Sequence, residues 1–375
     1  MQIDHVTLRT LRIPLVTPFT TSFSTQTART VLTVEVSARV AGREVTGWGE
    51  CGALAEPVYS DEYAAGAADV IERFLLPRLA AASADTVLTA ETVGELLEPV
   101  VGHRMAKAAL EAAILDAQLK AAGTSFATYL GVTRDRVPSG VSVGIQDSIR
   151  ALLDAVAGYL DEGYQRIKLK IQPGWDVEPV RAVREAHPDV ALQVDANAAY
   201  TLVDAAHLRR LDEFDLLLIE QPLAEDDLRQ HAELARAMAT PMCLDESVVS
   251  AASAADAIQL GAAAVINIKP SRVGGYLEAR RIHDVARASG IAVWCGGMLE
   301  TGLARGANAA LAGLPGFTLP GDISASSRFY ARDLTTPYVI ENGSIAVPTF
   351  PGLCEQPEAD ALAEFSTEVR EVSPA

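Results

Sequence analysis

The period of the hydrophobic positions changes twice along the chain. Residues 1–60 alternate between apolar and polar side chains as half-buried strands do, except in 18–26 and 50–60, which lack a period and predict loops. From residue 61 to about 123 the pattern is helical. Its clearest part is 103–122, which consists largely of good helix formers and stops at a glycine. The first third is therefore predicted to be an α+β unit.

From about residue 137, short apolar runs alternate with helical segments. Eight such runs with helices between them predict a parallel (β/α) barrel. The alternative is an open, doubly wound sheet, but no Gly-x-Gly-x-x-Gly follows the first run and the number of runs is that of a barrel. The predicted strands are 141–145, 166–171, 191–196, 216–222, 241–247, 264–270, 292–297 and 317–323.

Charged residues recur near the ends of these strands at an almost constant interval. Lys170, Asp195, Glu220 and Asp245 follow one another at intervals of 25 residues, and Lys269 comes 24 residues later. One strand and its helix have about this length, so each residue should occupy the same height on its own strand. We therefore expect all five at the C-terminal mouth of the barrel, where such folds build their catalytic sites.

Three of these residues are carboxylates on neighbouring strands. Asp195, Glu220 and Asp245 would repel one another unless a cation lay among them. Oxygen ligands suit a hard ion such as Mg²⁺, and Mn²⁺ could replace it. The alternative is that each acid caps the helix that follows it, which would explain one of them alone but not three in register. The sequence therefore predicts a divalent metal site.

Lysines are expected to face this site. Lys168 and Lys170 are two residues apart and share one face of a strand. A buried parallel strand has no solvent-facing side, so both should point into the barrel. Lys269 ends the sixth strand, which lies opposite the second in a ring of eight. Lys170 and Lys269 are therefore expected to face each other across the metal.

This arrangement predicts removal of a proton from the carbon next to a substrate carboxylate. Such a carbon acid is too weak to lose its proton to a lysine unaided, but Mg²⁺ on the carboxylate would stabilise the enediolate. The metal and Lys168 would also lower the pKa of Lys170 toward the working range. Removal on one face with return on the other is racemisation, whereas removal followed by loss of a group is elimination.

Charge and composition narrow the class of protein. The 375 residues carry a net charge of −18, which disfavours nucleic acid and anionic membranes as partners but leaves room for a small anionic substrate beside a metal and lysines. The four cysteines lie far apart with no Cys-x-x-Cys pair, so no disulfide framework is expected. Without a cationic leader or a run of about 18 apolar residues, the chain is predicted to be cytoplasmic.

Several segments resemble a known family. Lys-Leu-Lys at 168–170, with the three carboxylates and Lys269, is similar to the signature of the enolase superfamily, muconate-lactonizing subgroup. RIKLKIQPGWD, LQVDANAAY, LIEQPL, LDES, NIKPSRVGGYLEA, CGGMLETG and PGDIS resemble its o-succinylbenzoate synthase / N-succinylamino acid racemase (N-acylamino acid racemase) family. The resemblance implies an α/β fold: a modified TIM barrel of the (β/α)7β type at 131–339 and an α+β capping domain at 1–130, on which a tail of about 340–375 packs.

The same resemblance implies roles for single residues. The three strand-end carboxylates would be the Mg²⁺ ligands, and Lys170 and Lys269 the acid/base pair, with Lys168 beside them. In this family an arginine at the position of Arg272 is associated with racemase activity; the alternative is a solvated arginine at a helix start. Glu246 is expected to support the metal ligand before it. The residues implied in substrate binding are Ser142, Asn197, Phe19, Phe23, Gly297 and Met298.

The implied reactions are dehydration of 2-succinyl-6-hydroxy-2,4-cyclohexadiene-1-carboxylate to o-succinylbenzoate, a step of menaquinone biosynthesis, racemisation of N-succinylamino acids, or both. Arg272 favours both. The alternatives are dipeptide epimerisation and muconate cycloisomerisation, but dipeptide epimerases typically offer Asp-x-Asp at the eighth strand, where this chain has only Asp322. The complete set of ligands and lysines disfavours a non-catalytic barrel. Members of the family are generally homo-oligomers, which is the expectation here.

Overall fold

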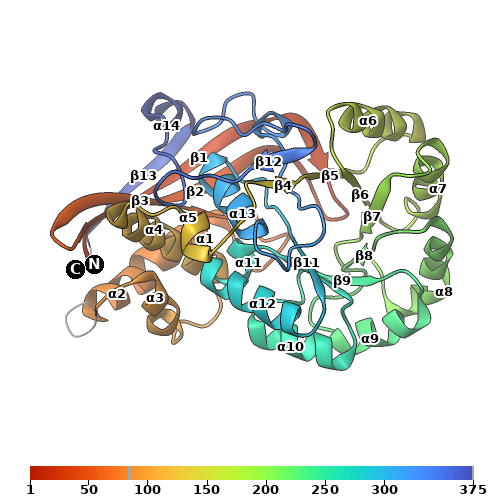
Figure 1. Ribbon diagram of the computed structural model, residues 1–375, viewed down its shortest axis with the longest axis horizontal. Coiled ribbons are helices and arrows are strands. Elements are labelled where there is room, and N and C mark those ends of the chain that lie inside the picture. The colour runs from red at the N-terminus through yellow and green to blue at the C-terminus, as the bar shows by residue number, and fades with distance from the viewer. Residues whose placement is uncertain (83–86, 374–375) are drawn as a thin grey trace.

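The computed structural model describes residues 1–82 and 87–373 and consists of two parts. An antiparallel sheet with its helices forms one side of the molecule, and a curled parallel sheet ringed by helices forms the other (Figure 1). The helical prediction for 61–123 includes 83–86, and the predicted tail includes 374–375; these residues lie outside the described part of the chain.

The capping sheet has four antiparallel strands in the order β13-β1-β2-β3. Helix α4 (Arg104–Ala122) packs across β2 and β3. Gly47 on β3 makes this close approach feasible, because a Cβ there would lie 2.0 Å from the carbonyl oxygen of Ala113. The helix ends where predicted, at Gly123, whose φ of 64° suits a residue without a side chain. The strands are β1 (Gln2–Thr20), β2 (Thr25–Val40), β3 (Arg43–Cys51) and β13 (Ser366–Val372).

One of the two predicted loops is largely strand. The prediction of a loop at 18–26 is wrong, because β1 runs to Thr20 and pairs there with Thr25 at the start of β2, which leaves only 21–24 for the turn. Threonine and phenylalanine favour extended structure, and pairing the two arms satisfies their backbone groups. The second predicted loop, 50–60, is irregular after the end of β3, as expected.

The parallel sheet has seven strands in the order β11-β10-β9-β8-β7-β6-β5, and helices cover its outer side (Figure 1). The first seven strand predictions are confirmed, although every observed strand is shorter than predicted. The strands are β5 (Gly140–Val143), β6 (Arg166–Lys170), β7 (Ala191–Asp195), β8 (Ile219–Glu220), β9 (Met242–Leu244), β10 (Val265–Ile268) and β11 (Ala292–Cys295). The helices between and after them are α6 (Ile149–Asp161), α7 (Val177–Ala186), α8 (Ala205–Leu208), α9 (Leu228–Ala237), α10 (Ala251–Leu260), α11 (Pro270–Val273), α12 (Tyr276–Ala288) and α13 (Gly302–Ala312).

The prediction of an eighth strand at 317–323 is wrong. The segment makes only isolated bridges to Val293 on β11 and to Ser139, just before β5. Pro320 has no N–H to donate and Gly321 weakens extended structure, so a continuous ladder does not form. Because the segment still bridges the first and last strands, the ring is closed by irregular chain instead of a strand.

The C-terminal segment returns to the capping sheet. Strand β13 pairs with β1 in the capping sheet, with Val6 opposite Val372 (Figure 1). Strand β12 (Ser344–Ala346) pairs with β4 (Arg136–Pro138), which precedes the barrel. Strand β13 thus lies on the cap, whereas β12 pairs with a strand inside the predicted barrel range. The predicted domain boundaries and tail stay predictions.

The remaining short helices connect these parts. No helix in residues 1–82 and 87–373 is long and apolar enough to cross a membrane. All four cysteines are buried and free, as the sequence predicts. The remaining helices are α1 (Ala64–Val70), a π-helical turn (Ile71–Leu75), α2 (Leu76–Ala82), α3 (Ala90–Leu97), α5 (Phe126–Leu130), α14 (Ala359–Phe365) and the 3-10 helices Leu202–Asp204, Arg209–Phe214 and Ser326–Arg328.

Candidate active site

The charged residues predicted at the barrel mouth lie at matching heights on their strands. Asp195 on β7 is the register partner of both Lys170 on β6 and Glu220 on β8. Asp245 and Lys269 come directly after the last residues of β9 and β10. All five side chains are buried, and Glu220 and Asp245 are fully so. Because buried charges must be paired, their contacts determine what the site can hold.

The two facing lysines each pair with one carboxylate. Lys170 Nζ lies 2.6 Å from Asp195 Oδ2, and Lys269 Nζ lies 2.6 Å from Asp245 Oδ2. As they stand, no three His, Cys, Asp or Glu side chains within the described ranges are arranged to hold a metal ion. The structure thus gathers the predicted ligands on neighbouring strands but pairs them with ammonium groups instead of preforming a ligand triad.

The electrostatics of the carboxylates nevertheless suit a cation. Burial and the negative charges of Asp195 and Asp245 raise the pKa of Glu220 to about 7. Asp245 Oδ1 is buried and accepts no hydrogen bond from the described residues, although Arg272 Nε lies 3.0 Å away. Three buried carboxylates on neighbouring strands and an oxygen without a hydrogen bond are what a hard divalent ion would need. The residues present therefore fit Mg²⁺.

Lys168 is held between three carboxylates. Its Nζ lies 2.6 Å from Asp322 Oδ2, 3.0 Å from Glu220 Oε2 and 3.3 Å from Asp195 Oδ2. Arg166 Nη1 contacts the other oxygen of Asp322 at 2.8 Å. Although burial opposes the shift, these two cations hold the pKa of Asp322 below its usual range. Asp322 is therefore occupied by two partners of the chain itself and is not free to bind an ammonium group of a substrate.

A tyrosine and an arginine surround Asp245. Tyr59, from the loop after β3, donates a hydrogen bond to Asp245 Oδ2 at 3.2 Å and accepts one from Lys269 at 3.1 Å. Arg272 is only 5% exposed and donates to the carbonyl oxygen of Asn267 at 2.9 Å. The alternative interpretation of Arg272 as a solvated arginine at a helix start is therefore wrong. Arg272 is built into the site and reaches Lys269 through Asp245.

Asn197 links the other lysine to Glu246. Its Oδ1 accepts a hydrogen bond from Lys170 at 2.6 Å, and its Nδ2 donates to Glu246 Oε1 at 3.0 Å. Burial and the charge of Asp245 raise the pKa of Glu246 to about 8. Glu246 follows the predicted metal ligand Asp245 in the chain, but its hydrogen-bond partner is Asn197, which was predicted to contact substrate.

Two small cavities open beside the lysines, and both are lined by Lys170, Lys269 and Gly297. The first, about 50 Å³, also has Ser142, Lys168, Asp322 and Phe329 in its wall. The second, about 60 Å³, also borders Asn197 and Met298. On the cap side Phe19 lines both cavities, and Phe23 and Tyr59 line the second; we call these three residues the capping wall. All six predicted substrate-binding residues therefore border the cavities.

Among the lining residues that the sequence did not predict are Tyr59, Asp322 and Phe329. Tyr59 lies in the predicted loop at 50–60, but nothing in the sequence distinguishes it from its neighbours. Asp322 stands out only as a lone acid in the eighth predicted strand. Phe329 lies in irregular chain beyond that strand and has no periodic signal. All three residues lie in irregular segments of the chain. The regular spacing of strands and helices cannot locate such segments.

Comparison with known proteins agrees with this geometry. Residues 4–131 match the family model "Mandelate racemase / muconate lactonizing enzyme, N-terminal domain", and residues 151–361 match "Enolase C-terminal domain-like". An N-succinylamino acid racemase of Amycolatopsis sp is 60% identical over 98% of each chain. An o-succinylbenzoate synthase of Geobacillus kaustophilus is 46% identical over 94% of this chain and 93% of the relative.

Solved structures of enolase superfamily proteins have the same fold as this chain. An enolase superfamily protein from Listeria innocua, 36% identical over the whole of both chains, superposes with a TM-score of 0.94. A muconate lactonizing enzyme from Pseudomonas fluorescens superposes with a TM-score of 0.89 at 24% identity, over 97% of this chain and 99% of that one. The resemblance inferred from the strand-end residues is therefore confirmed: this chain is an enzyme of the enolase superfamily, with the N- and C-terminal domains of its mandelate racemase and muconate lactonizing enzyme group.

Proposed function

We propose that this chain is a Mg²⁺-dependent enzyme that dehydrates 2-succinyl-6-hydroxy-2,4-cyclohexadiene-1-carboxylate to o-succinylbenzoate and racemises N-succinylamino acids. The observation that carries the proposal is that Lys170, at the end of β6, and Lys269, directly after β10, line the same two cavities and are paired with carboxylates. The names of the most similar relatives support both activities.

The two lysines would act on opposite faces of the α-carbon. Lys170 Nζ removes the α-proton from one enantiomer, and Lys269 Nζ supplies a proton to the other face, which inverts the centre. In the dehydration the same removal is followed by departure of the neighbouring hydroxyl group, which takes up the proton held by Lys170 Nζ and leaves as water. Asn197 and Tyr59, which contact the two lysine nitrogens at 2.6 and 3.1 Å, orient them toward the cavities.

The metal site would be formed by Asp195, Glu220 and Asp245. A bound Mg²⁺ supplies positive charge that stabilises the negative charge developing on the substrate carboxylate as its α-proton leaves. Lys168 neutralises part of the carboxylate cluster and is fixed by Asp322. The double pairing of Asp322 also disfavours dipeptide epimerisation, since a free substrate ammonium would lack a carboxylate at this position.

Arg272 is proposed to favour racemisation. It contacts the carboxylate that also pairs with Lys269, so it can adjust how readily that lysine exchanges a proton. Removing its charge by Arg272→Gln should therefore lower racemisation more than dehydration, because only racemisation needs both lysines in turn. An equal loss of both activities would instead mean that Arg272 acts only in holding Asp245.

The test uses purified protein with Mg²⁺ in D₂O. It is offered N-succinyl-L-phenylalanine and, in parallel, the cyclohexadiene precursor, while optical rotation, α-deuteration and absorbance are followed. Turnover of both supports the proposal, and turnover of the precursor alone would remove the racemase half. Chelation should abolish activity and lower the Tm, with Mg²⁺ restoring both, because an ion bound to the native state stabilises it. If an unblocked dipeptide is turned over faster than the N-succinyl substrate, dipeptide epimerisation replaces N-succinylamino acid racemisation as the proposed activity.

A further inference from the structure

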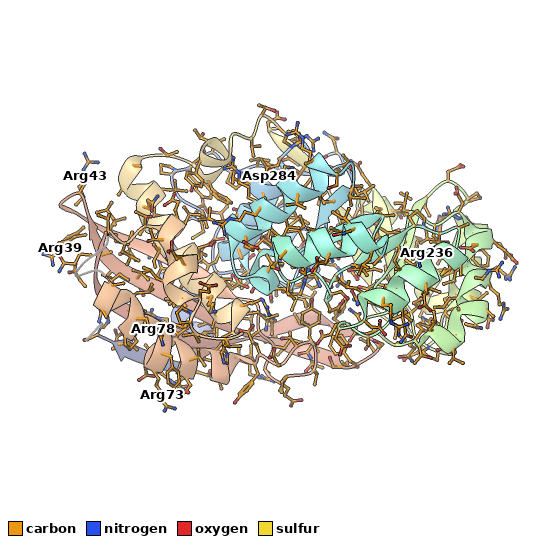
Figure 2. All side chains as sticks on the ribbon, turned by 90° about the horizontal axis from the view of Figure 1, so that it is seen from below. Arg39, Arg43, Arg73, Arg78, Arg236 and Asp284 are labelled. Atoms are coloured by element: carbon orange, nitrogen blue, oxygen red, sulfur yellow. The ribbon has the colours of Figure 1, made fainter. Side chains whose placement is uncertain are left out.

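Arg328 is a buried arginine beside the site whose charge no carboxylate of the described residues neutralises. Its exposed fraction is 8%, whereas arginines such as Arg43 and Arg73 project from the outer edge of the molecule (Figure 2). A buried arginine is usually paired with an acid. The partners of Arg328 are instead aromatic rings, one carbonyl and one hydroxyl, and its Nε has no hydrogen-bond acceptor. Its position therefore requires another explanation.

Three aromatic rings surround the guanidinium. Its central carbon lies 4.9 Å from the ring centroids of Tyr159 and Phe329 and 5.8 Å from that of Phe19. Tyr159 belongs to α6 of the barrel and Phe329 to the segment after the eighth predicted strand, whereas Phe19 belongs to the β1–β2 hairpin of the cap. A desolvated cation is attracted to the electron-rich faces of such rings. Arg328 therefore joins the capping wall to the barrel.

The contacts of Arg328 coincide with a bend in the hairpin. Residues 15–18 of β1 lie opposite Thr27 alone on β2, and an insertion of this kind bends a strand. Arg328 Nη1 lies 3.5 Å from the hydroxyl of Thr17 in this bulge, and Nη2 donates to the carbonyl of Ser142 on β5 at 3.2 Å. One guanidinium thus contacts the bend, the hairpin tip and the first barrel strand.

The base of Arg328 is fixed to the barrel side. It ends the 3-10 helix that begins at Ser326, whose hydroxyl donates to Asp333 at 2.5 Å and accepts from the backbone of Tyr338 at 3.0 Å. The hairpin tip is tied less firmly: the carbonyl of Thr20 and the hydroxyl of Ser22 each make one hydrogen bond to loops at the barrel mouth. Within the described part of the chain these are the only hydrogen bonds between residues 19–26 and the barrel, so few contacts oppose a movement of the tip.

The cavities show why the tip has to move. Their volumes are about 50 and 60 Å³, whereas pockets for small ligands measure roughly 300–1,000 Å³. A third cavity, of about 300 Å³, borders Phe23, Tyr59 and Asn197 but neither lysine. A substrate therefore fits beside the two lysines only if the capping wall shifts, and chemistry follows when the wall closes again. We propose that Arg328 is a positioning residue: it latches the hairpin tip, residues 19–26, over the site through Phe19 without touching substrate. The catalytic consequence of the latch rests on the proposed function, but the latch itself does not.

The first test measures hydrogen–deuterium exchange without substrate. In Arg328→Met, exchange in peptides covering residues 15–26 should rise about tenfold, while the barrel strands keep their protection. Arg328→Lys, which keeps the charge but not the planar fork, should give a smaller rise and carries the test if the methionine variant does not fold. Arg332→Met is the matched control, because Arg332 lies four residues further on and pairs with acids only at the surface. Unchanged exchange in the hairpin, or a rise spread evenly over the barrel, would refute the latch.

The second test measures turnover of the succinyl substrates. Arg328→Met should raise KM about tenfold and change kcat less than about threefold, because the closed form is less populated before binding. A loss of kcat at unchanged KM would contradict a latch and indicate a role in the chemistry. If the unmodified enzyme turns over none of these substrates, the proposed function fails, and the exchange experiment alone decides the role of Arg328.

Discussion

The two sides of the site are built in different ways. The barrel floor, which consists of Lys168, Lys170, Asp195, Glu220, Asp245 and Lys269, stands at the ends of parallel strands, and its side chains are fixed by ion pairs with one another. The capping wall stands on a hairpin and a loop, and it is held by aromatic contacts and by the two hydrogen bonds of the Tyr59 hydroxyl. The floor is rigid and charged, whereas the wall is adaptable and largely apolar.

This difference indicates that the floor serves proton transfer and the wall serves the entry and binding of substrate. A proton can be moved reproducibly only if the acid and base keep their geometry, which strand ends provide. A substrate must enter and leave, which loops and hairpins allow. We therefore expect substitutions in the floor to reduce kcat and substitutions in the wall to change KM.

The largest effect is expected from removing a lysine of the floor. Lys269→Ala should lower racemisation by about 10³-fold, because the inverted centre can no longer receive its proton. Slow α-proton exchange should persist for the enantiomer whose proton faces Lys170, and Lys170→Ala should show the opposite preference. Exchange into each enantiomer in D₂O, followed by NMR, measures both. Racemisation that survives in either variant at more than about a tenth of the original rate would contradict the two-lysine assignment.

A smaller effect is expected from the wall. Phe23 packs against Tyr59 at a ring distance of 6.2 Å and lines one cavity. Phe23→Ala should raise KM about tenfold with little change in kcat, because it removes apolar contact with the substrate but no charged group. Steady-state kinetics would measure this. Val16→Ala, which changes an exposed residue of the same hairpin, is the control, and a Phe23→Ala variant that mainly loses kcat would break the comparison.

The smallest effect is expected on the pH dependence of stability, from a buried acid at the interface between the cap and the barrel. Glu111 on α4 is 4% exposed and accepts a hydrogen bond from Leu277 on α12 at 3.2 Å. Burial raises its pKa from 4.5 to about 8, so the folded state holds a proton that the unfolded chain has released. This group therefore lowers stability as the pH rises from about 4.5 to 8, with no further loss above that.

Glu111→Gln should remove this dependence. The fall in Tm between pH 5 and pH 9 should become smaller by roughly 5 °C, as measured by thermal unfolding at both pH values. Kinetic constants at pH 7 should stay unchanged, because Glu111 borders neither cavity. An unaltered pH profile would show that the carboxyl group does not keep its proton in the folded protein.

The same contrast explains what the sequence could predict. The floor repeats with the strand–helix unit, so the spacing from Lys170 to Lys269 is sufficient to locate it. The wall has no such period: the hairpin has the irregular pattern of a loop, and Tyr59, Phe329 and Arg328 give no signal. The eighth strand failed because Pro320 and Gly321 interrupt an otherwise apolar run. Pairing of the carboxylates with lysines depends on three-dimensional charge balance, which a linear pattern does not contain.

The pairing of β13 with β1 has a consequence for the order of folding. The outer strand of the capping sheet is supplied by residues 366–372, more than 340 positions after the strand that it joins. During synthesis, the cap therefore keeps an open edge until almost the whole chain has left the ribosome, whereas the neighbouring barrel strands can assemble in sequence. A chain truncated before β13 would leave β1 exposed as a template for pairing with other copies.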